Sequence, residues 1–236
     1  MTSYLTQNPC YKQGRPLSVR GLMLHSVGCP QPSAQVFVKN WNSPTFKNAC
    51  VHGFIDANTG AVYQTLPWTM RGWHAGGAAN NTHIGVEMCE PATIKYNGGA
   101  SYVDLDPVKT KKAILTTYKS AVELFASLCK QFNLDPLKDG VIISHKEGHA
   151  RGIATNHGDP EHLWKPYGLT MDGFRKDVKS KMEDSHAWSK EAVDWVKANG
   201  IMVGNAQGDM MLESPLTREQ FIVALYRYEK FKEGRK

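Results

Sequence analysis

The sequence predicts a mixed α/β fold, in which helices flank a central mixed β-sheet, followed by a small C-terminal α-helical module. Short apolar segments with strand character recur through the first two thirds of the chain, amphipathic segments lie between and after them, and the composition changes near residue 183. Strands and helices do not alternate regularly, which argues against a Rossmann or barrel fold. We therefore expect two domains, residues 1–182 and residues 183–236.

Five segments are expected to form the sheet. Residues 19–27 have strand character and are followed by a Gly-Cys-Pro loop. Residues 52–56 and 61–67 flank the sequence Ala-Asn-Thr-Gly, which predicts a hairpin. Residues 83–90 and 140–145 are apolar enough to be central strands.

Three helices are expected in the same domain. A short helix should begin after Ser33, which can act as its cap. Asp106 and Pro107 predict the start of a long helix that lies on the sheet. Its apolar residues recur at helical spacing: Ile114, Tyr118, Ala121, Phe125, Leu128 and Phe132. A further helix should begin at Thr170.

The C-terminal module is predicted to be helix, glycine-rich loop, helix. Ser189 is the expected cap of the first helix, with Trp188 and Val193 as a hydrophobic staple, and Gly200 can end that helix. A capping box over residues 217–220 predicts the start of the second helix. With so few core positions the module would be only marginally stable alone, so we expect it to pack against another protein surface.

The chain is basic, with a net charge of +6 and a pI near 9.0. This favours an anionic partner, which charge alone leaves open among nucleic acid, a membrane surface and an acidic wall polymer. The Lys and Arg residues are scattered and do not form a stripe with interleaved aromatic residues. We therefore expect no nucleic-acid binding.

Two further patterns bear on the compartment. The N-terminus lacks the apolar run of a signal peptide, and no segment reaches about 18 uninterrupted apolar residues, so no membrane insertion is expected. The five cysteines form no CxxC pair. These patterns favour a protein made in the cytoplasm, which would need a separate factor to reach the outside.

Metal ligands occur at or near the ends of expected strands and in the polar stretch 149–164. His25 lies near the end of the first strand, His145 ends the last, and Asp159 follows in the sequence HGDPEHLW. A catalytic zinc site needs three protein ligands and one open position, and histidine with carboxylate is a common mixture. Spacing alone leaves the alternative that these histidines are surface or hydrogen-bonded residues.

Five segments, in order, resemble the zinc-dependent N-acetylmuramoyl-L-alanine amidases of the phage-lysozyme and peptidoglycan-recognition type. They are LMLHSVG, HGFIDANTGAVYQTLP, GWHAGG, HIGVEMCEP and IISHKEGHARGIATNHGDPEHLW, and the resemblance covers about residues 18–180. It implies a zinc ion (Zn2+) held by His25, His145 and Asp159. Some relatives have cysteine at the third position, so Asp159 is an allowed variant.

The resemblance also implies catalytic roles for Glu87 and His157. Glu87 occupies the position of the carboxylate that takes a proton from the metal-bound water and returns it to the leaving amine. The alternative is a buried glutamate satisfied by an ion pair. Relatives often have a lysine at His157 and a tyrosine at Val51. His157 could supply the oxyanion donor or be an idle loop residue.

Four more residues are implied to bind substrate. His52, Trp73 and His74 match positions that line or support the groove for glycan and stem peptide, since aromatic faces suit sugar rings and apolar peptide. Trp73 could instead be a lid on the core. Arg151 could bind a peptide carboxylate through its fork of donors, or could be solvated.

Residues 188–227 resemble a single S-layer homology repeat, a unit that in other proteins binds secondary cell-wall polymers. Arg218 is the implied anion contact. Because such repeats usually occur in threes, three readings remain open: a weak wall anchor, a module that assembles with copies from other chains, or a helical cap on the amidase.

Together these resemblances imply a phage or prophage endolysin that hydrolyses the amide bond between N-acetylmuramic acid and L-alanine of peptidoglycan. It would be made in the host cytoplasm without a signal peptide and would act on the cell wall after release through the membrane. The alternative is a non-catalytic peptidoglycan-recognition module, although such members tend to lose a zinc ligand.

Overall fold

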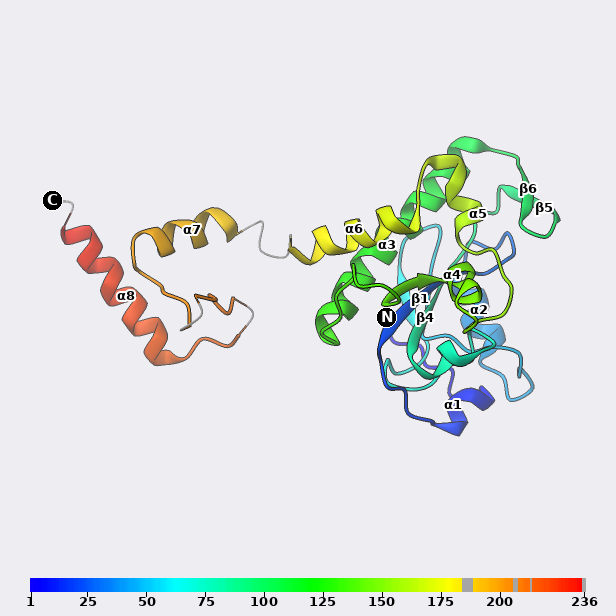
Figure 1. Cartoon of the computed structure of the whole chain (residues 1–236), viewed down its shortest axis with the longest axis horizontal. Helices are drawn as coiled ribbons and strands as arrows, with labels where there is room; N and C mark the ends of the chain where they lie inside the picture. The colour runs from blue at the N-terminus through cyan, green and yellow to red at the C-terminus, as the bar shows by residue number, and fades with distance from the viewer. Residues whose placement is uncertain (184–188, 206–207, 213, 235–236) are drawn as a thin grey trace. The chain divides into compact units, whose positions relative to one another are not determined.

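A computed structural model describes residues 1–183, 189–205, 208–212 and 214–234. The chain divides into two compact units, Met1–Met182 and Glu183–Lys236 (Figure 1). The predicted staple residue Trp188 lies outside the described residues.

The N-terminal unit is built on a five-stranded mixed sheet in the order β3-β2-β4-β1-β7. Strand β1 pairs in parallel with β4 on one side and with β7 on the other, β2 is parallel to β4, and β3 is antiparallel to β2. The predicted mixed sheet is therefore confirmed, but the strand expected within residues 140–145 to be central, β7, lies at one edge of the sheet. The strands are β1 (Gly21–Ser26), β2 (Gly53–Ile55), β3 (Val62–Gln64), β4 (His83–Met88) and β7 (Ile142–Ser144).

Helices flank this sheet, as predicted (Figure 1). The long helix α3 packs against β2 and β4, and the Asp106 side chain accepts a hydrogen bond from the Lys109 amide at its start. The helices are α1 (Pro9–Gln13), α2 (Ala34–Trp41), η1 (Ala78–Asn81), α3 (Pro107–Gln131), α4 (His145–Ala150), α5 (Glu161–Trp164), η2 (Lys165–Tyr167) and α6 (Met171–Glu183). None of the described helices is long and apolar enough to span a bilayer.

The alternation of side chains along the central strands separates the core from the polar site. Leu22 and Leu24 of β1 pack with Phe125 of α3 in the main hydrophobic core. Successive side chains of a strand point to opposite faces. Met23 and His25 therefore project from the other face of the sheet, away from α3.

Among the features that the sequence did not predict, two lie next to the site. A hairpin follows β4, formed by β5 (Ile94–Gly98) and β6 (Ser101–Asp104), and its turn uses Gly98 and Gly99 at positive φ. The strand expected to run to residue 145 ends at Ser144, because that side chain caps α4 in a reciprocal pair with Glu147.

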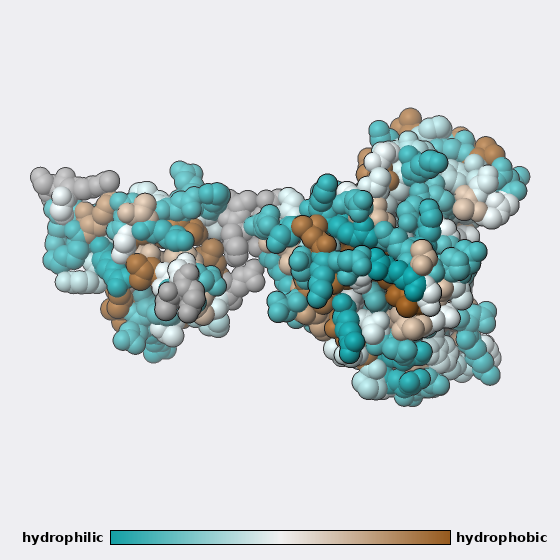
Figure 2. Space-filling model, viewed as in Figure 1, coloured by the Kyte–Doolittle hydropathy of each residue, from teal (hydrophilic) through white to brown (hydrophobic). Residues whose placement is uncertain are grey.

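The C-terminal unit contains α7 (Lys190–Ala198) and α8 (Arg218–Glu233). The predicted capping box is present, with Thr217 and Gln220 as its two members. Trp195 packs against Phe231, with ring centroids 5.4 Å apart. Figure 2 shows hydrophobic residues, in brown, at the surface of this unit. The exposed ones on α8 are Phe221, Ile222, Val223, Leu225, Tyr226 and Tyr228.

Candidate metal centre and catalytic cavity

The C-terminal ends of three parallel strands form the floor of a cavity of about 790 Å³. His25 of β1 lies beside Glu87 of β4 in the strand register, and His145 follows directly after β7. Ligands commonly bind at the carboxyl ends of strands in open α/β sheets, where neighbouring strands bring their next residues together.

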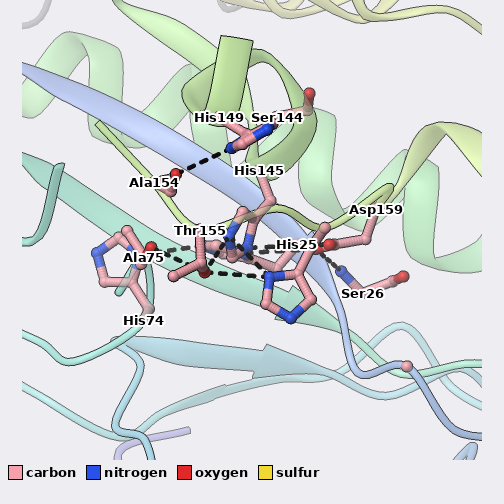
Figure 3. Close-up of polar contacts among 12 residues, drawn as sticks. His25, Ser26, His74, Ala75, Ser144, His145, His149, Ala154, Thr155 and Asp159 are labelled. Carbon is pink, nitrogen blue, oxygen red and sulfur yellow. Dashed lines mark hydrogen bonds and ion pairs between the residues drawn. The ribbon is translucent and has the colours of Figure 1, made fainter. Parts of the chain in front are cut away.

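Three side chains meet at this floor with the spacing of a metal site (Figure 3). His25 Nδ1 lies 3.0 Å from His145 Nδ1 and 3.4 Å from Asp159 Oδ2, and His145 Nδ1 lies 3.8 Å from Asp159 Oδ1. Ligands about 2.0–2.1 Å from a tetrahedral zinc ion lie about 3.3 Å from one another. The two nitrogens and the carboxylate therefore fit a zinc ion, and the structure brings together the three predicted ligands.

The protonation of these groups suits a cation site. Burial lowers the pKa of His145 to about 4, which keeps its imidazole neutral. Burial raises the pKa of Asp159, but hydrogen bonding and charge from His25 outweigh it, so that pKa lies below its usual value. Burial also opposes charge on His25, whose pKa is nevertheless raised by Asp159 and Glu87. The negative charge of Asp159 thus favours a cation at this position, either a proton on His25 or a metal ion in its place.

Glu87 projects into the same cavity from β4. Burial raises the pKa of its carboxyl to about 8, although His25 pulls in the opposite direction. Its Oε2 atom is buried and has no hydrogen-bond partner among the described residues. The alternative role of Glu87 is a structural one, in which an ion pair satisfies its carboxyl. The described part of the chain contains no such ion-pair partner for Glu87.

His157 lies at the exposed rim of the cavity, next to a metal ligand. Its Nδ1 lies 3.2 Å from His145 Nε2 and 3.1 Å from Thr155 Oγ1. Thr155 Oγ1 is itself 3.1 Å from His145 Nε2. His157 is thus placed both to contact a ligand in the cavity and to orient His145.

Two residues expected to bind substrate are buried instead. His52 is fully buried, and its ring bonds only backbone, with Nδ1 accepting from the Gly85 amide and Nε2 2.7 Å from the Met70 carbonyl. His74 is 8% exposed and lies behind His25. His52 therefore offers neither surface nor a free polar atom to a glycan or peptide and is placed only to support the groove, whereas His74 keeps a small exposed area at the cavity lining.

The remaining predicted residues divide between the cavity and the outer surface. Trp73 lines the cavity and also packs in a small core with Cys50. Arg151 does not reach the cavity, because its guanidinium pairs with Asp139 on the surface, with Nη1 3.0 Å from Oδ2. Arg218 is exposed at the first position of α8.

Sequence reasoning missed Thr155 and the wall made by the β5–β6 hairpin. Tyr96, Gly99 and Ala100 of the hairpin line the cavity. The Tyr96 hydroxyl donates to Glu90 Oε2 at 2.8 Å and lies 2.7 Å from His162 Nε2. The Gly-Gly pair at residues 98–99 was the available signal for a turn at this point.

The fold and the site therefore define an α/β protein with a candidate His-His-Asp metal centre beside a carboxyl group of raised pKa. Residues 13–162 match the family model described as N-acetylmuramoyl-L-alanine amidase. This match covers more than half of the chain, which therefore belongs to the N-acetylmuramoyl-L-alanine amidase family. A search of curated proteins found no match.

Solved structures share the fold at low sequence identity. The Staphylococcus aureus hydrolase AmiA, solved in complex with its ligand, superposes with a TM-score of 0.57 at 17% identity, covering 75% of this chain and 79% of that one. The PlyG catalytic domain superposes with a TM-score of 0.54 at 16% identity, covering 77% of this chain and 94% of that one. A mutant endolysin from Bacillus subtilis superposes with a TM-score of 0.50 at 20% identity, covering 75% of this chain and 97% of that one.

Proposed function

We propose that this protein is a zinc-dependent peptidoglycan amidase, which hydrolyses the amide bond between N-acetylmuramic acid and L-alanine of the stem peptide. The observation that carries the proposal is the placement of Glu87 in one cavity with His25, His145 and Asp159, in a chain of the amidase family. A bound zinc ion would lower the pKa of a water molecule and polarise the carbonyl to be attacked.

Glu87 is the proposed catalytic base and acid. Its Oε2, buried and without a partner, would accept a proton from the attacking water and return it to the L-alanine amine as that group leaves. A raised pKa suits this exchange, since a group that titrates near the working pH can both accept and donate. The positive charge of a zinc ion held by His25 would favour the carboxylate that the first step requires.

The exposed rim would position the substrate. The imidazole of His157 points into the cavity region and would donate a hydrogen bond to the oxygen that gains charge in the tetrahedral intermediate. Trp73 and Tyr96 supply aromatic surface on the cavity wall. Such surface packs against sugar rings and against the apolar parts of a stem peptide.

The C-terminal unit is proposed to hold the enzyme on the wall. Its support is the exposed Arg218 at the start of α8 and a cavity of about 450 Å³ lined in part by Glu219 and Arg227 of the same helix. An arginine fork suits the anionic groups of a secondary wall polymer. The exposed apolar residues of α8 also suit self-association. The setting we propose is lysis of a bacterial wall by a phage or prophage endolysin.

The test is release of new L-alanine amino termini from purified peptidoglycan. The native protein, loaded with zinc, is compared with the same protein after chelation and with the variants His25→Ala and Glu87→Gln. Arg151→Gln is a matched control, because that charged side chain lies outside the cavity. We expect chelation and both site variants to lower release by about 100-fold or more, while the control retains activity.

Wall binding without release would favour the alternative. If zinc-loaded native protein binds peptidoglycan but frees no amino termini, the protein is a recognition module and not an enzyme. If release continues undiminished in Glu87→Gln, the role of that carboxyl is wrong and the base lies elsewhere.

A further inference from the structure

His74 contacts His25, the most buried of the three candidate ligands, through the ring nitrogen that does not face His145 and Asp159. We propose that His74 is a positioning residue: it fixes the ring of His25 so that Nδ1, and not Nε2, faces the metal. The inference rests on the proposed function only in taking zinc as the ion.

The contacts of His25 assign its two ring nitrogens to different tasks. Nδ1 faces His145 and Asp159, while Nε2 lies 3.0 Å from His74 Nδ1 on the opposite side of the ring (Figure 3). The next link is equally close, since His74 Nε2 lies 3.0 Å from the backbone carbonyl of His83. A carbonyl can only accept, so His74 Nε2 carries the proton and His74 Nδ1 is the acceptor.

This order of donors decides the state of His25. An acceptor at His74 Nδ1 requires a proton on His25 Nε2, which leaves the lone pair of a neutral His25 on Nδ1, where the other two ligands converge. Metal-bound histidines commonly donate their second ring N–H to an acceptor that fixes tautomer and orientation. Here the acceptor is another histidine, and its own state is set by the main chain of β4.

The structure around His74 allows little movement. The amides of His74 and Ala75 both donate to the Asn80 side chain, at 2.8 and 2.9 Å. On β4, the ring packs on Gly85, where a Cβ atom would lie 2.3 Å from His74 Cγ. Any larger residue at position 85 would push the ring away from its place behind His25. The glycine and the histidine are therefore parts of one arrangement.

The experiment measures zinc affinity without substrate, by competition with a chromophoric chelator. It compares native protein with His74→Leu, which removes the acceptor, and His74→Gln, whose amide can accept from His25 and donate to His83. His83→Leu is the matched control: it also removes a buried imidazole, but one that contacts the Gly140 carbonyl and the Thr82 hydroxyl and not His25.

We expect His74→Leu to weaken zinc binding about 10–100-fold, as changes at such supporting residues do, and His74→Gln to recover most of the loss. The control should bind zinc as the native protein does, even if it is less stable. A second readout is the imidazole N–H of His25 in ¹⁵N-labelled, zinc-loaded protein. This proton should be protected from exchange in the native protein and in His74→Gln, and lost in His74→Leu.

Three results would overturn the inference: a folded His74→Leu protein with native zinc affinity, a His74→Gln protein that binds zinc no better than His74→Leu, or a native protein that binds no zinc. A native protein that binds zinc but cleaves no peptidoglycan would instead contradict the proposed function and leave the role of His74 intact.

Discussion

The carboxylate of Asp159 contacts both a side chain and the main chain at the end of β1: its Oδ2 lies 3.4 Å from His25 Nδ1 and accepts a hydrogen bond from the Ser26 amide at 3.2 Å. The loop that carries Asp159 is thereby tied to the strand that carries His25. The amide holds the carboxylate in place, and the imidazole gives it a charged neighbour.

Asp159→Asn should therefore weaken zinc binding while leaving the loop in place. Asparagine retains an oxygen for the Ser26 amide but loses the negative charge. We expect zinc affinity to fall by more than about 100-fold, since changes at supporting residues alone cost about 10–100-fold. Asp139→Asn is the matched control, because Asp139 is exposed and pairs with Arg151 outside the cavity. Equal zinc affinity in the two variants would remove Asp159 from the ligand set.

Glu87→Gln should stabilise the metal-free protein at high pH. Burial raises the pKa of Glu87 from 4.5 to about 8. Between about pH 4.5 and 8 the unfolded chain therefore binds fewer protons at this position than the folded protein, and stability falls as pH rises. The variant removes this loss, and we expect its free energy of unfolding at pH 8 to exceed that of the native protein by about 1–3 kcal/mol. This is less than the full pKa shift would give, because Glu87 is partly exposed to solvent.

Urea denaturation of chelator-treated protein at pH 5 and pH 8 measures this gain. The difference between variant and native protein should grow with pH. Glu123→Gln, at a half-exposed carboxyl on α3, should show no such growth. A difference that does not change with pH would mean that Glu87 is charged in the folded protein throughout.

His157→Ala separates the two roles that the geometry allows. If the imidazole donates to the developing oxyanion, kcat should fall about 10²–10³-fold at saturating zinc, and His157→Lys should restore much of it. If it only orients His145, zinc affinity should fall and excess zinc should restore kcat. His149→Ala is the control, since His149 is exposed outside the cavity lining. Native kinetics in His157→Ala would show that neither role matters.

The two capping boxes should respond differently to the same change. Ser144→Ala removes the cap of α4 and the hydrogen bond to Glu161 at 2.8 Å, and should cost the N-terminal unit about 1–2 kcal/mol. Because His145 is the next residue, zinc affinity should fall too. Thr217→Ala removes the cap of α8, and should cost about 1 kcal/mol of stability in the C-terminal unit only. Calorimetry with and without zinc checks both expectations, and unaltered zinc binding in Ser144→Ala would show that the cap does not position His145.

Local patterns were enough for most elements of the fold. Apolar periodicity located α3, and the strands β1, β4 and β7 followed from short apolar segments, because burial on a face or a stripe leaves a regular signal in the chain. The β5–β6 hairpin was not predicted, since most of its residues are exposed or only partly buried and its strands pair only with each other.

Residue type and, above all, the family resemblance identified the candidate ligands. Neither of them identified what the residues around the ligands do. His52, His74 and Arg151 were all assigned to the substrate groove. The structure buries His52 beneath the cavity, leaves His74 with only a small exposed area behind His25, and pairs Arg151 with Asp139. Residue type cannot separate these cases, because an imidazole in a groove and an imidazole behind a ligand have the same sequence signal.

Which side of the sheet each residue faces could be read from the chain, because alternation along a strand is a local property. The sequence alone did not show which side chains come into contact across the sheet. The 3.0 Å separations of His25 from both His145 and His74 depend on the parallel pairing of β1 with β4 and β7, and on a loop held by Asn80. These contacts join segments far apart in sequence, and only the folded chain brings them within hydrogen-bonding distance.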